Sequence, residues 1–324
     1  MDDRLIATLT AQFFNALTIG GIYALIALGY TMVYGIIELI NFAHGDVFMV
    51  GSFVTLWLLA TIGVQGTVSD PILLVALLIL MFAFAMVVMG TIGVLIERFA
   101  YRPLRRAPRL APLITAIGVS FILQNIIQVL YSTADFNIPQ VIDPQAGVKF
   151  HMPSFTIGSF QVTSSEVRLT WLALFIFLIA VAMMIGLQLF IRRTRLGRAM
   201  RSTAIDREAA QLMGVDINTT IALTFFIGSA LAGAAGVAWA LNYGHTKFDI
   251  GFQAGLKSFT AAVLGGIGNT TGAAIGGFLI AFIEVFSSQI GYARWSEAIV
   301  FSVLILVLVF KPTGILGQQL AERA

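Results

Sequence analysis

Apolar stretches of about 20 residues recur from one end of the chain to the other, separated by short polar segments. Each is long enough to cross the roughly 30 Å hydrocarbon core of a bilayer as an α-helix, which rises about 1.5 Å per residue. The apolar runs cover 13–37, 47–63, 72–96, 112–131, 169–191 and 218–241, with two or three more between 257 and 310. The pattern predicts an all-α polytopic membrane protein with roughly eight spans, nine or ten also being compatible with it.

Composition leads to the same class. Of the 324 residues, 58% are hydrophobic and 11% are charged, and the mean hydropathy is +0.93, which excludes a soluble protein. The whole chain, residues 1–324, is predicted to form a single transmembrane domain. The lack of cysteine excludes disulfides, thiolate metal sites and a cysteine nucleophile. The first residues, with Asp2, Asp3 and Arg4 before an apolar run longer than that of a signal peptide, predict no cleaved signal.

Positive charge is concentrated in two short segments. Residues 97–111 and 192–217 hold 11 of the 19 lysine and arginine residues, and the positive-inside rule places both loops in the cytoplasm. The C-terminal tail, with Lys311 and Arg323, is expected on the same side. Residues 132–168 lie between the two loops, include Pro139, Pro144 and Pro153, and are predicted to form an extended periplasmic lid or a short amphipathic piece. The basic residues that raise the pI to 9.3 are therefore explained by membrane topology, and no nucleic-acid partner is predicted.

Two polar interruptions fall inside apolar regions, at 40–46 and 264–272. Unwound backbone at membrane depth is tolerated only where protein or a water-filled cavity covers it, so we expect re-entrant or broken helices here. The candidates for the translocation path are Asn41, Phe42, His44, Gly45, Asp46, Gly265, Gly266 and Gly268.

The polar side chains of the first interruption have two interpretations. Asn41, His44 and Asp46 either satisfy backbone groups at a helix break or line the path, and we favour the break over direct substrate contact by roughly two to one. His44 and Asp46 alone are too few ligands to predict a metal site.

The second basic loop also has the character of a helix. Residues 199–213 favour a helix that lies outside the membrane and is available to a partner, with Asp206 suited to an N-cap and Gly214 to the position past the helix end. Within it, Glu208-Ala209-Ala210 with Gly214 four residues later resembles the EAA loop of ABC-transporter permeases. The hydrophobic-Leu-Pro that often follows this loop is replaced by residues 221–224, Ile-Ala-Leu-Thr. This resemblance implies an ATPase-coupling helix that contains Arg207, Glu208, Ala209, Ala210 and Gly214.

Five separated segments extend the resemblance to nearly the whole chain. Residues 23–37, 40–46, 97–105, 259–268 and 311–317 occur in family order and resemble the LivH-type permease of bacterial branched-chain amino acid ABC importers, the first of two paired permeases. The resemblance is weakest over 132–168. It implies a multi-pass subunit of the bacterial inner membrane that translocates branched-chain or related neutral amino acids. The implied partners are a second permease subunit (LivM-like), two ATP-binding subunits, a periplasmic substrate-binding protein, the small-molecule substrate and membrane lipid.

The chain is predicted to be a transport subunit and not an enzyme. No G-x-x-x-x-G-K-[ST] loop is present, and the nearest segment, 251–258, has Leu256 where the motif needs glycine before Lys257. We therefore expect no cofactor on this chain, with ATP and Mg²⁺ used by partner subunits. No nucleophile elbow or paired-carboxylate arrangement predicts catalysis.

Two other functions are compatible with the sequence. The first is an ABC permease for urea or short amides, since relatives of this family carry such solutes. The other is an ion-coupled secondary transporter or channel for a small neutral solute, in which Glu284, Asp46 and His44 form the coupling set. Against the second function, Glu284 is expected near the membrane surface or paired with another helix, and Lys257 is expected to extend toward the outer interface.

Overall fold

The computed structural model describes residues 4–105, 107–108, 110–143, 145–152, 155–157, 160–162 and 165–317. Most of these residues are helical. The long helices are α1 (Arg4–Ile37), α2 (Ala43–Ile62), α3 (Pro71–Ile96), α4 (Leu110–Tyr131), α5 (Trp171–Arg193), α8 (Ile217–Tyr243), α9 (Ile250–Gly265), α10 (Thr270–Ser287) and α11 (Ser296–Phe310). Short helical turns follow α3, namely η1 (Glu97–Tyr101) and η2 (Arg102–Leu104), and join α10 to α11, namely η3 (Ser288–Tyr292) and η4 (Ala293–Trp295).

The all-α polytopic fold is confirmed. Within the described residues, seven helical segments are long and apolar enough to cross a membrane. The estimate of eight spans differs because the seventh segment, Thr270–Phe310, contains both α10 and α11, with Gly291 at φ 99° between them. The helix α9 spans 16 residues and is too short to be counted.

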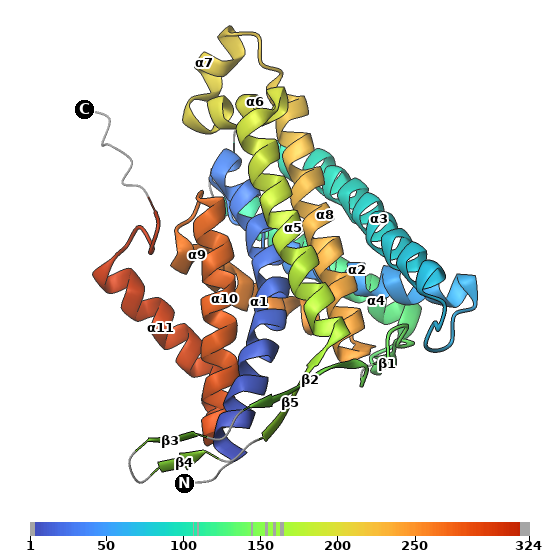
Figure 1. The fold of residues 1–324 in the computed structure, drawn as a ribbon. Coiled ribbons are helices and arrows are strands. Elements are labelled where there is room, and N and C mark those ends of the chain that lie inside the picture. Colours follow the sequence, from blue (N-terminus) through green and yellow to red (C-terminus); the bar gives the residue numbers. More distant parts are fainter. Residues whose placement is uncertain are drawn as a thin grey trace.

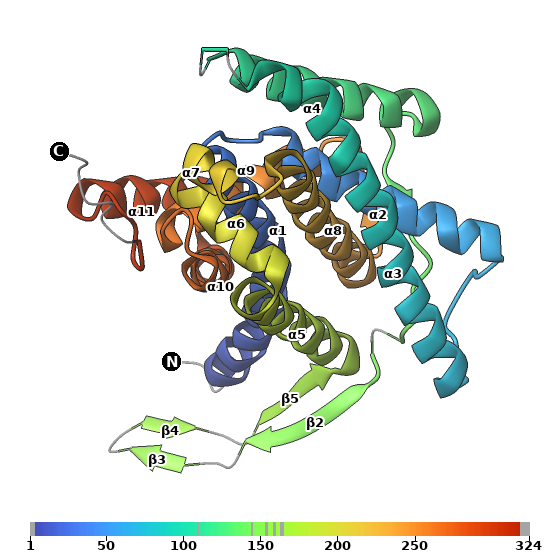
Figure 2. The ribbon, with the colours of Figure 1, turned by 90° about the horizontal axis from the view of Figure 1, so that it is seen from above.

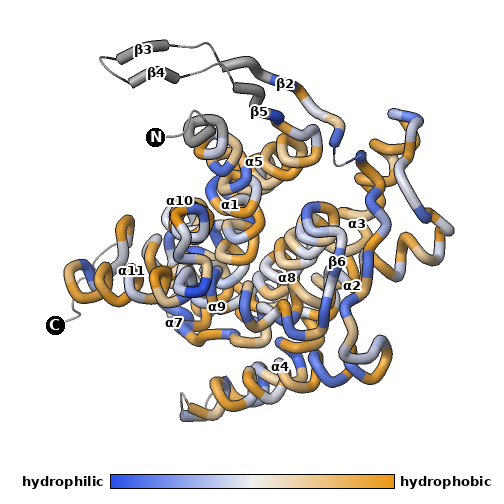
Figure 3. Tube along the Cα trace, turned by 90° about the horizontal axis from the view of Figure 1, so that it is seen from below, coloured by the Kyte–Doolittle hydropathy of each residue, from blue (hydrophilic) through white to orange (hydrophobic). Residues whose placement is uncertain are grey.

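The inner and outer helices differ sharply in burial. Helix α1 lies in the middle of the bundle (Figure 2), where 94% of its apolar window is buried and where it contacts α5, α8, α9 and α10. In α4 and α5 only 17% of the corresponding window is buried. Hydrophobic residues predominate in the outer helices, among them α4 and α11 (Figure 3). Exposed apolar side chains on these two helices include Leu130 and Phe310. Such side chains are the ones that lipid hydrocarbon covers in a membrane protein.

The two arginine-rich segments lie at one end of the bundle. The helices α6 (Arg195–Ile205) and α7 (Arg207–Leu212) form that end, and the strands and the beginning of α1 lie at the other (Figure 1). Arg105, in the first basic segment, donates to Asn218 Oδ1 at 2.7 Å, at the start of α8 directly after α7. Assignment of this end to the cytoplasm stays a prediction.

Several residues named from the sequence lie outside the described residues, namely Asp2, Asp3, Arg106, Arg109, Pro144, Pro153 and Arg323.

The segment between α4 and α5 is largely extended. β1 (Phe136–Asn137) pairs antiparallel with β6 (His245–Thr246), which follows α8. The strands β2 (Gly147–Met152) and β5 (Ser165–Thr170) pair antiparallel, with Gly147 opposite Thr170 and Met152 opposite Ser165. Between them, β3 (Phe155–Ile157) pairs with β4 (Phe160–Val162).

The single helix predicted over 199–213 is wrong in one respect, because the chain forms two helices there. Asp206 separates α6 from α7 and has an extended backbone, with φ −155° and ψ 113°. Its carboxylate accepts hydrogen bonds from the backbone N–H groups of Glu208 and Ala209, so its predicted role as an N-cap is confirmed. Gly214 follows the end of α7 with φ 84°, the left-handed conformation expected past a helix end.

Candidate functional site

The first polar interruption is the link between α1 and α2. The chain leaves α1 through Glu38, which has a left-handed φ of 54°, and α2 begins at Ala43. Asn41, His44 and Asp46 are all buried, at 3%, 0% and 1% exposure. Protein therefore covers Asn41 in the link and the first turn of α2, whereas Glu38, at the start of the link, is exposed.

Asn41 joins this link to the segment that follows α3. Its Oδ1 accepts a hydrogen bond of 3.0 Å from the hydroxyl of Tyr101, in η1. The Tyr101 side chain is itself buried, and its ring lies 5.2 Å from that of Phe225 on α8. The bond to Asn41 therefore positions the break against both α3 and α8.

Asp46 joins α2 to α4. Its Oδ1 accepts a hydrogen bond of 3.0 Å from Gln124 Nε2, and its Oδ2 accepts one from the Ser120 hydroxyl. The donors are one helical turn apart on the same face of α4. Asn41 and Asp46 thus bond to side chains of other helical segments, and their role at the break or in the path stays a prediction.

His44 is buried without a hydrogen bond to either ring nitrogen from the residues that the structure describes. Its ring packs edge-on against Tyr30 of α1, with the ring centroids 4.7 Å apart. A β-carbon on Gly29 would lie 2.2 Å from His44 Nε2, so glycine is needed beside the imidazole. Among the described residues, no group of three or more His, Cys, Asp or Glu side chains is placed to hold a metal ion.

The glycines of the second interruption form the turn between α9 and α10. Gly266 and Gly268 have φ values of 108° and 88°, which L side chains rarely adopt. The segment after α11 covers the end of α9, because the N–H of Leu316 donates to Gly265 O at 3.0 Å. This turn is therefore fixed by the C-terminal segment.

The two interruptions meet at one narrow cavity. A space of about 10 Å³ is lined by Asn41 from the first interruption, by Ile267 from the second and by Tyr30 of α1. This volume is about that of one water molecule. The structure thus brings Asn41 and the turn around Ile267 together. The other path candidates do not line the cavity, namely Phe42, His44, Gly45, Asp46, Gly265, Gly266 and Gly268.

Gly45 provides a close contact between α2 and α9. A β-carbon at this position would lie 2.3 Å from Gly251 O and 2.9 Å from the Cα of Gly255. The atoms concerned are backbone, so no rotamer change could relieve the contact. Gly45 therefore serves packing between helices, as small residues do in membranes.

The helix α7 lies beyond the apolar part of the bundle. Ala210 is buried, while Glu208 and Ala209 are exposed. Leu212 and Met213, at its end, are 88% and 85% exposed. A short capped helix with an exposed apolar tip is suited to docking on another protein.

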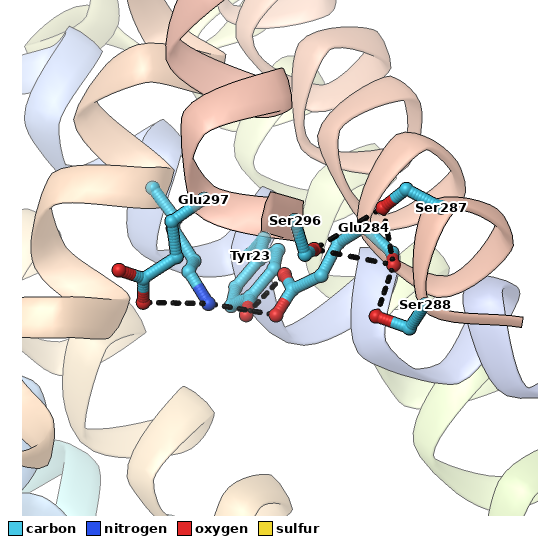
Figure 4. A network of polar contacts seen from close by, with 7 residues as sticks. Tyr23, Glu284, Ser287, Ser288, Ser296 and Glu297 are labelled. Carbon is cyan, nitrogen blue, oxygen red and sulfur yellow. Dashed lines mark hydrogen bonds and ion pairs between the residues drawn. The ribbon is translucent and has the colours of Figure 1, made fainter. Parts of the chain in front are cut away.

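Glu284 and Lys257 form a half-buried ion pair, and Figure 4 shows the polar network around Glu284. Lys257 Nζ donates to Glu284 Oε1 at 2.7 Å, and the hydroxyl of Tyr23 donates to Oε2 at 2.9 Å. The predicted pairing of Glu284 with another helix is confirmed. The Lys257 side chain is 12% exposed and its amine is bound to Glu284; that it extends toward the outer interface stays a prediction.

The ion-coupling set of the alternative function does not assemble as one cluster. Glu284 bonds to Lys257 and Tyr23, whereas Asp46 bonds to Ser120 and Gln124.

Sequence reasoning missed the partners of the buried polar groups. Ser120 and Gln124 are spaced four apart in an apolar helix, a pattern that marks one polar face and could have identified them. Tyr101 lies in one of the segments that carry the family resemblance, 97–105, but nothing in the sequence indicates its contact with Asn41.

Comparison with known proteins places the chain among transport permeases. Residues 12–308 match the family described as "Branched-chain amino acid transport system / permease component". The chain is 43% identical over 312 residues to the high-affinity branched-chain amino acid transport system permease protein BraD of Pseudomonas aeruginosa, covering 96% of this chain and 97% of that protein. It is also 43% identical to the corresponding protein LivH of Escherichia coli (strain K12), covering 96% of each. The probable branched-chain amino acid transport permease protein LivH of Methanocaldococcus jannaschii is 27% identical over 94% of this chain and 91% of that protein. No solved structure matches the chain.

Proposed function

The chain belongs to the family of permease components of branched-chain amino acid transport systems, and on this premise we propose which of its parts carry out transport. It is a multi-pass membrane subunit of an ABC-type transport system. We propose that α7 is the element through which ATP hydrolysis on a separate chain drives transport. The link between α1 and α2 and the turn between α9 and α10 then belong to the translocation path.

The proposed cargo is a branched-chain or related neutral amino acid, moved across the bacterial inner membrane. The names of the relatives at 42–43% identity over 96% of the chain support this cargo. The proposed partners are a second, similar permease, two ATP-binding subunits that use ATP and Mg²⁺, and a periplasmic substrate-binding protein.

The proposed path would be closed in the conformation described. The cavity between the two interruptions has a volume of about 10 Å³, which accommodates about one water molecule and no amino acid. Transport therefore requires the helices around Asn41 and Ile267 to separate. A second conformation, favoured by nucleotide binding to the partner subunits, would supply that opening.

The observation that carries the coupling proposal is the exposed tip of α7. Leu212 and Met213 are apolar side chains at the arginine-rich end of the bundle, outside the helices that lipid would cover. Burying them in a groove of an ATP-binding subunit would remove apolar surface from water, which stabilises association.

Replacement of one of these side chains tests the proposal. We expect Leu212→Asp to insert normally but to lose both co-purification of the ATP-binding subunits and ATP-dependent uptake of leucine into proteoliposomes. The matched control is Val148→Asp, which places the same charge on an exposed apolar residue at the opposite end and is expected to retain the ATP-binding subunits. Normal association and uptake in Leu212→Asp would contradict the role of α7. Uptake without ATP, driven by an ion gradient, would support a secondary transporter instead.

A further inference from the structure

Arg207, the first residue of α7, bonds to the end of α1. Its Nη2 donates to the backbone carbonyl of Ile36 at 2.7 Å, although the two residues are 171 positions apart in the chain. Arg207 is half-buried, whereas its neighbour Glu208 is exposed. Two adjacent residues of the same short helix thus have different surroundings, and Arg207 is held by the permease itself.

The bond supplies a cation where α1 has none of its own. The last carbonyl groups of a helix lack partners within it and carry partial negative charge, which a basic side chain stabilises. The last turn of α1 contains no basic residue. Glu38 ends the helix with φ 54°, so the guanidinium of Arg207 acts at the point where the polar link begins.

A cavity lies between α7 and this link. It has a volume of about 460 Å³ and is lined by Glu38 and Leu39 on one side and by Ile205 and Arg207 on the other. The side chain of Arg207 therefore bridges α7 and α1 along the wall of an open space. Beyond the bond, the link continues to Asn41, which contacts Tyr101 and lines the narrow cavity of the path.

We propose that Arg207 is a positioning residue that transmits the displacement of α7 to the end of α1, and through it to the polar link at the closed cavity. This inference rests on the proposed coupling role of α7 and assigns its residues to different tasks. The exposed tip at Leu212 and Met213 binds the ATP-binding subunit, and Arg207 carries the movement inward.

The test compares two arginines that make the same kind of bond. Arg201 of α6 donates from Nη1 to the carbonyl of Ile191 near the end of α5, so Arg201→Gln removes an equal charge and an arginine-to-carbonyl bond that does not involve α1. In the complete transport complex in proteoliposomes, Arg207→Gln is expected to retain the ATP-binding subunits and ATP hydrolysis. The number of amino acids moved per ATP should fall about tenfold, the factor that corresponds to about 1.4 kcal/mol. Arg201→Gln should keep the wild-type ratio, and Arg207→Lys, which keeps a cationic donor, should recover part of it.

A distance measurement separates loss of transmission from misfolding. Because the chain has no cysteine, spin labels can be attached at Glu38→Cys and Gln211→Cys alone. We expect the distance between the labels to stay nearly constant on ATP binding with Arg207 present, and to change with Arg207→Gln because α7 moves without α1.

The outcomes distinguish this inference from the proposal on which it rests. A wild-type transport ratio in Arg207→Gln would overturn the inference. Loss of the ATP-binding subunits in Arg207→Gln would also overturn it, by making Arg207 a docking residue, while leaving α7 as the coupling element. Normal association and uptake in Leu212→Asp would instead contradict the coupling role of α7.

Discussion

Lys257 and Glu284 show how individual charges are accommodated inside the bundle. A single charged group in a low-dielectric interior is costly, and a bonded partner offsets much of that cost. Glu284 receives two hydrogen bonds, from Lys257 and from Tyr23, on two different helices. Removing the charge of Glu284 leaves Lys257 with only the more distant Glu297 carboxylate, so replacing Glu284 alone is expected to cost more than replacing both residues.

We expect Glu284→Gln to lower the free energy of unfolding by about 1–3 kcal/mol, because it leaves the half-buried Lys257 amine with only the more distant carboxylate of Glu297 as a counter-charge. The double variant Lys257→Met with Glu284→Gln should recover part of this loss. Unfolding in mild detergent measures both. Glu297→Gln is the control, since Glu297 is 59% exposed and 3.7 Å from Lys257, and it should cost less than about 1 kcal/mol. Equal losses for Glu284→Gln and Glu297→Gln would show that the half-buried pair is not stabilising.

The partners of these residues were largely invisible in the sequence. That Glu284 pairs with another helix could be inferred from the cost of an unpaired carboxylate in an apolar run. Lys257 could not be identified as its partner, because residues on two helices can be paired only when the packing of those helices against each other is known. The same limit applies to Asn41 with Tyr101, which are 60 positions apart.

Helix ends, in contrast, were predictable because their determinants are local. Asp206 and Gly214 were assigned from residue type and spacing, and both have the expected conformation. The break between α6 and α7 follows from the same cap, since the extended backbone of an N-cap interrupts the helix before it. The prediction for 199–213 was wrong only in placing an N-cap residue, Asp206, inside one continuous helix.

The cap of α8 gives a prediction about pH. Hydrogen bonds from the hydroxyl and backbone N–H of Thr219 to Asp216 hold the pKa of this carboxyl below its ordinary value. A lowered pKa in the folded state stabilises the fold above the ordinary value of about 3.9 and less as the pH falls below it. The melting temperature of the wild type should therefore exceed that of Asp216→Ala at neutral pH, and the difference should shrink below about pH 4. A difference that does not depend on pH would contradict ionisation of the cap.

Packing between α2 and α9 gives a second prediction for these elements. Gly45→Ala places a β-carbon 2.3 Å from Gly251 O, so the two helices must separate. We expect a loss of about 1–3 kcal/mol in the free energy of unfolding, together with reduced uptake. Gly118→Ala, on α4, is the matched control because a β-carbon there meets nothing within 4 Å. Equal free energies of unfolding for the two variants would show that the close contact at Gly45 does not affect stability.

At the scale of the whole molecule, the orientation in the membrane is open to direct test. The positive-inside rule places α7 in the cytoplasm and the segment before β1 in the periplasm. We expect Asp135→Cys to react with a membrane-impermeant maleimide in intact cells, and Gln211→Cys to react only after the cells are opened. The absence of native cysteine makes the labelling specific. The reverse pattern would invert the topology.

The polytopic helical architecture was predictable, because the length of an apolar run directly indicates whether the segment can cross a membrane. The count of spans was not, because α9 is 16 residues long and because the helical turns η3 and η4 join α10 to α11. The strand pair β1–β6 was also missed, since its strands are two residues each and lie more than 100 positions apart. Local sequence does not contain that information.

The glycine contacts of α2 have a mechanical consequence. Helix faces with side chains interlock as ridges and grooves, and the register between them is fixed. At two points along α2 the contacts are backbone against backbone, at Gly51 with Gly233 of α8 and at Gly45 with Gly251 of α9. Where no side chain lies between two helices, one helix can slide along the other without passing through unfavourable rotamers, which favours shear motion. The permease core can therefore remain tightly packed while one helix glides past the next.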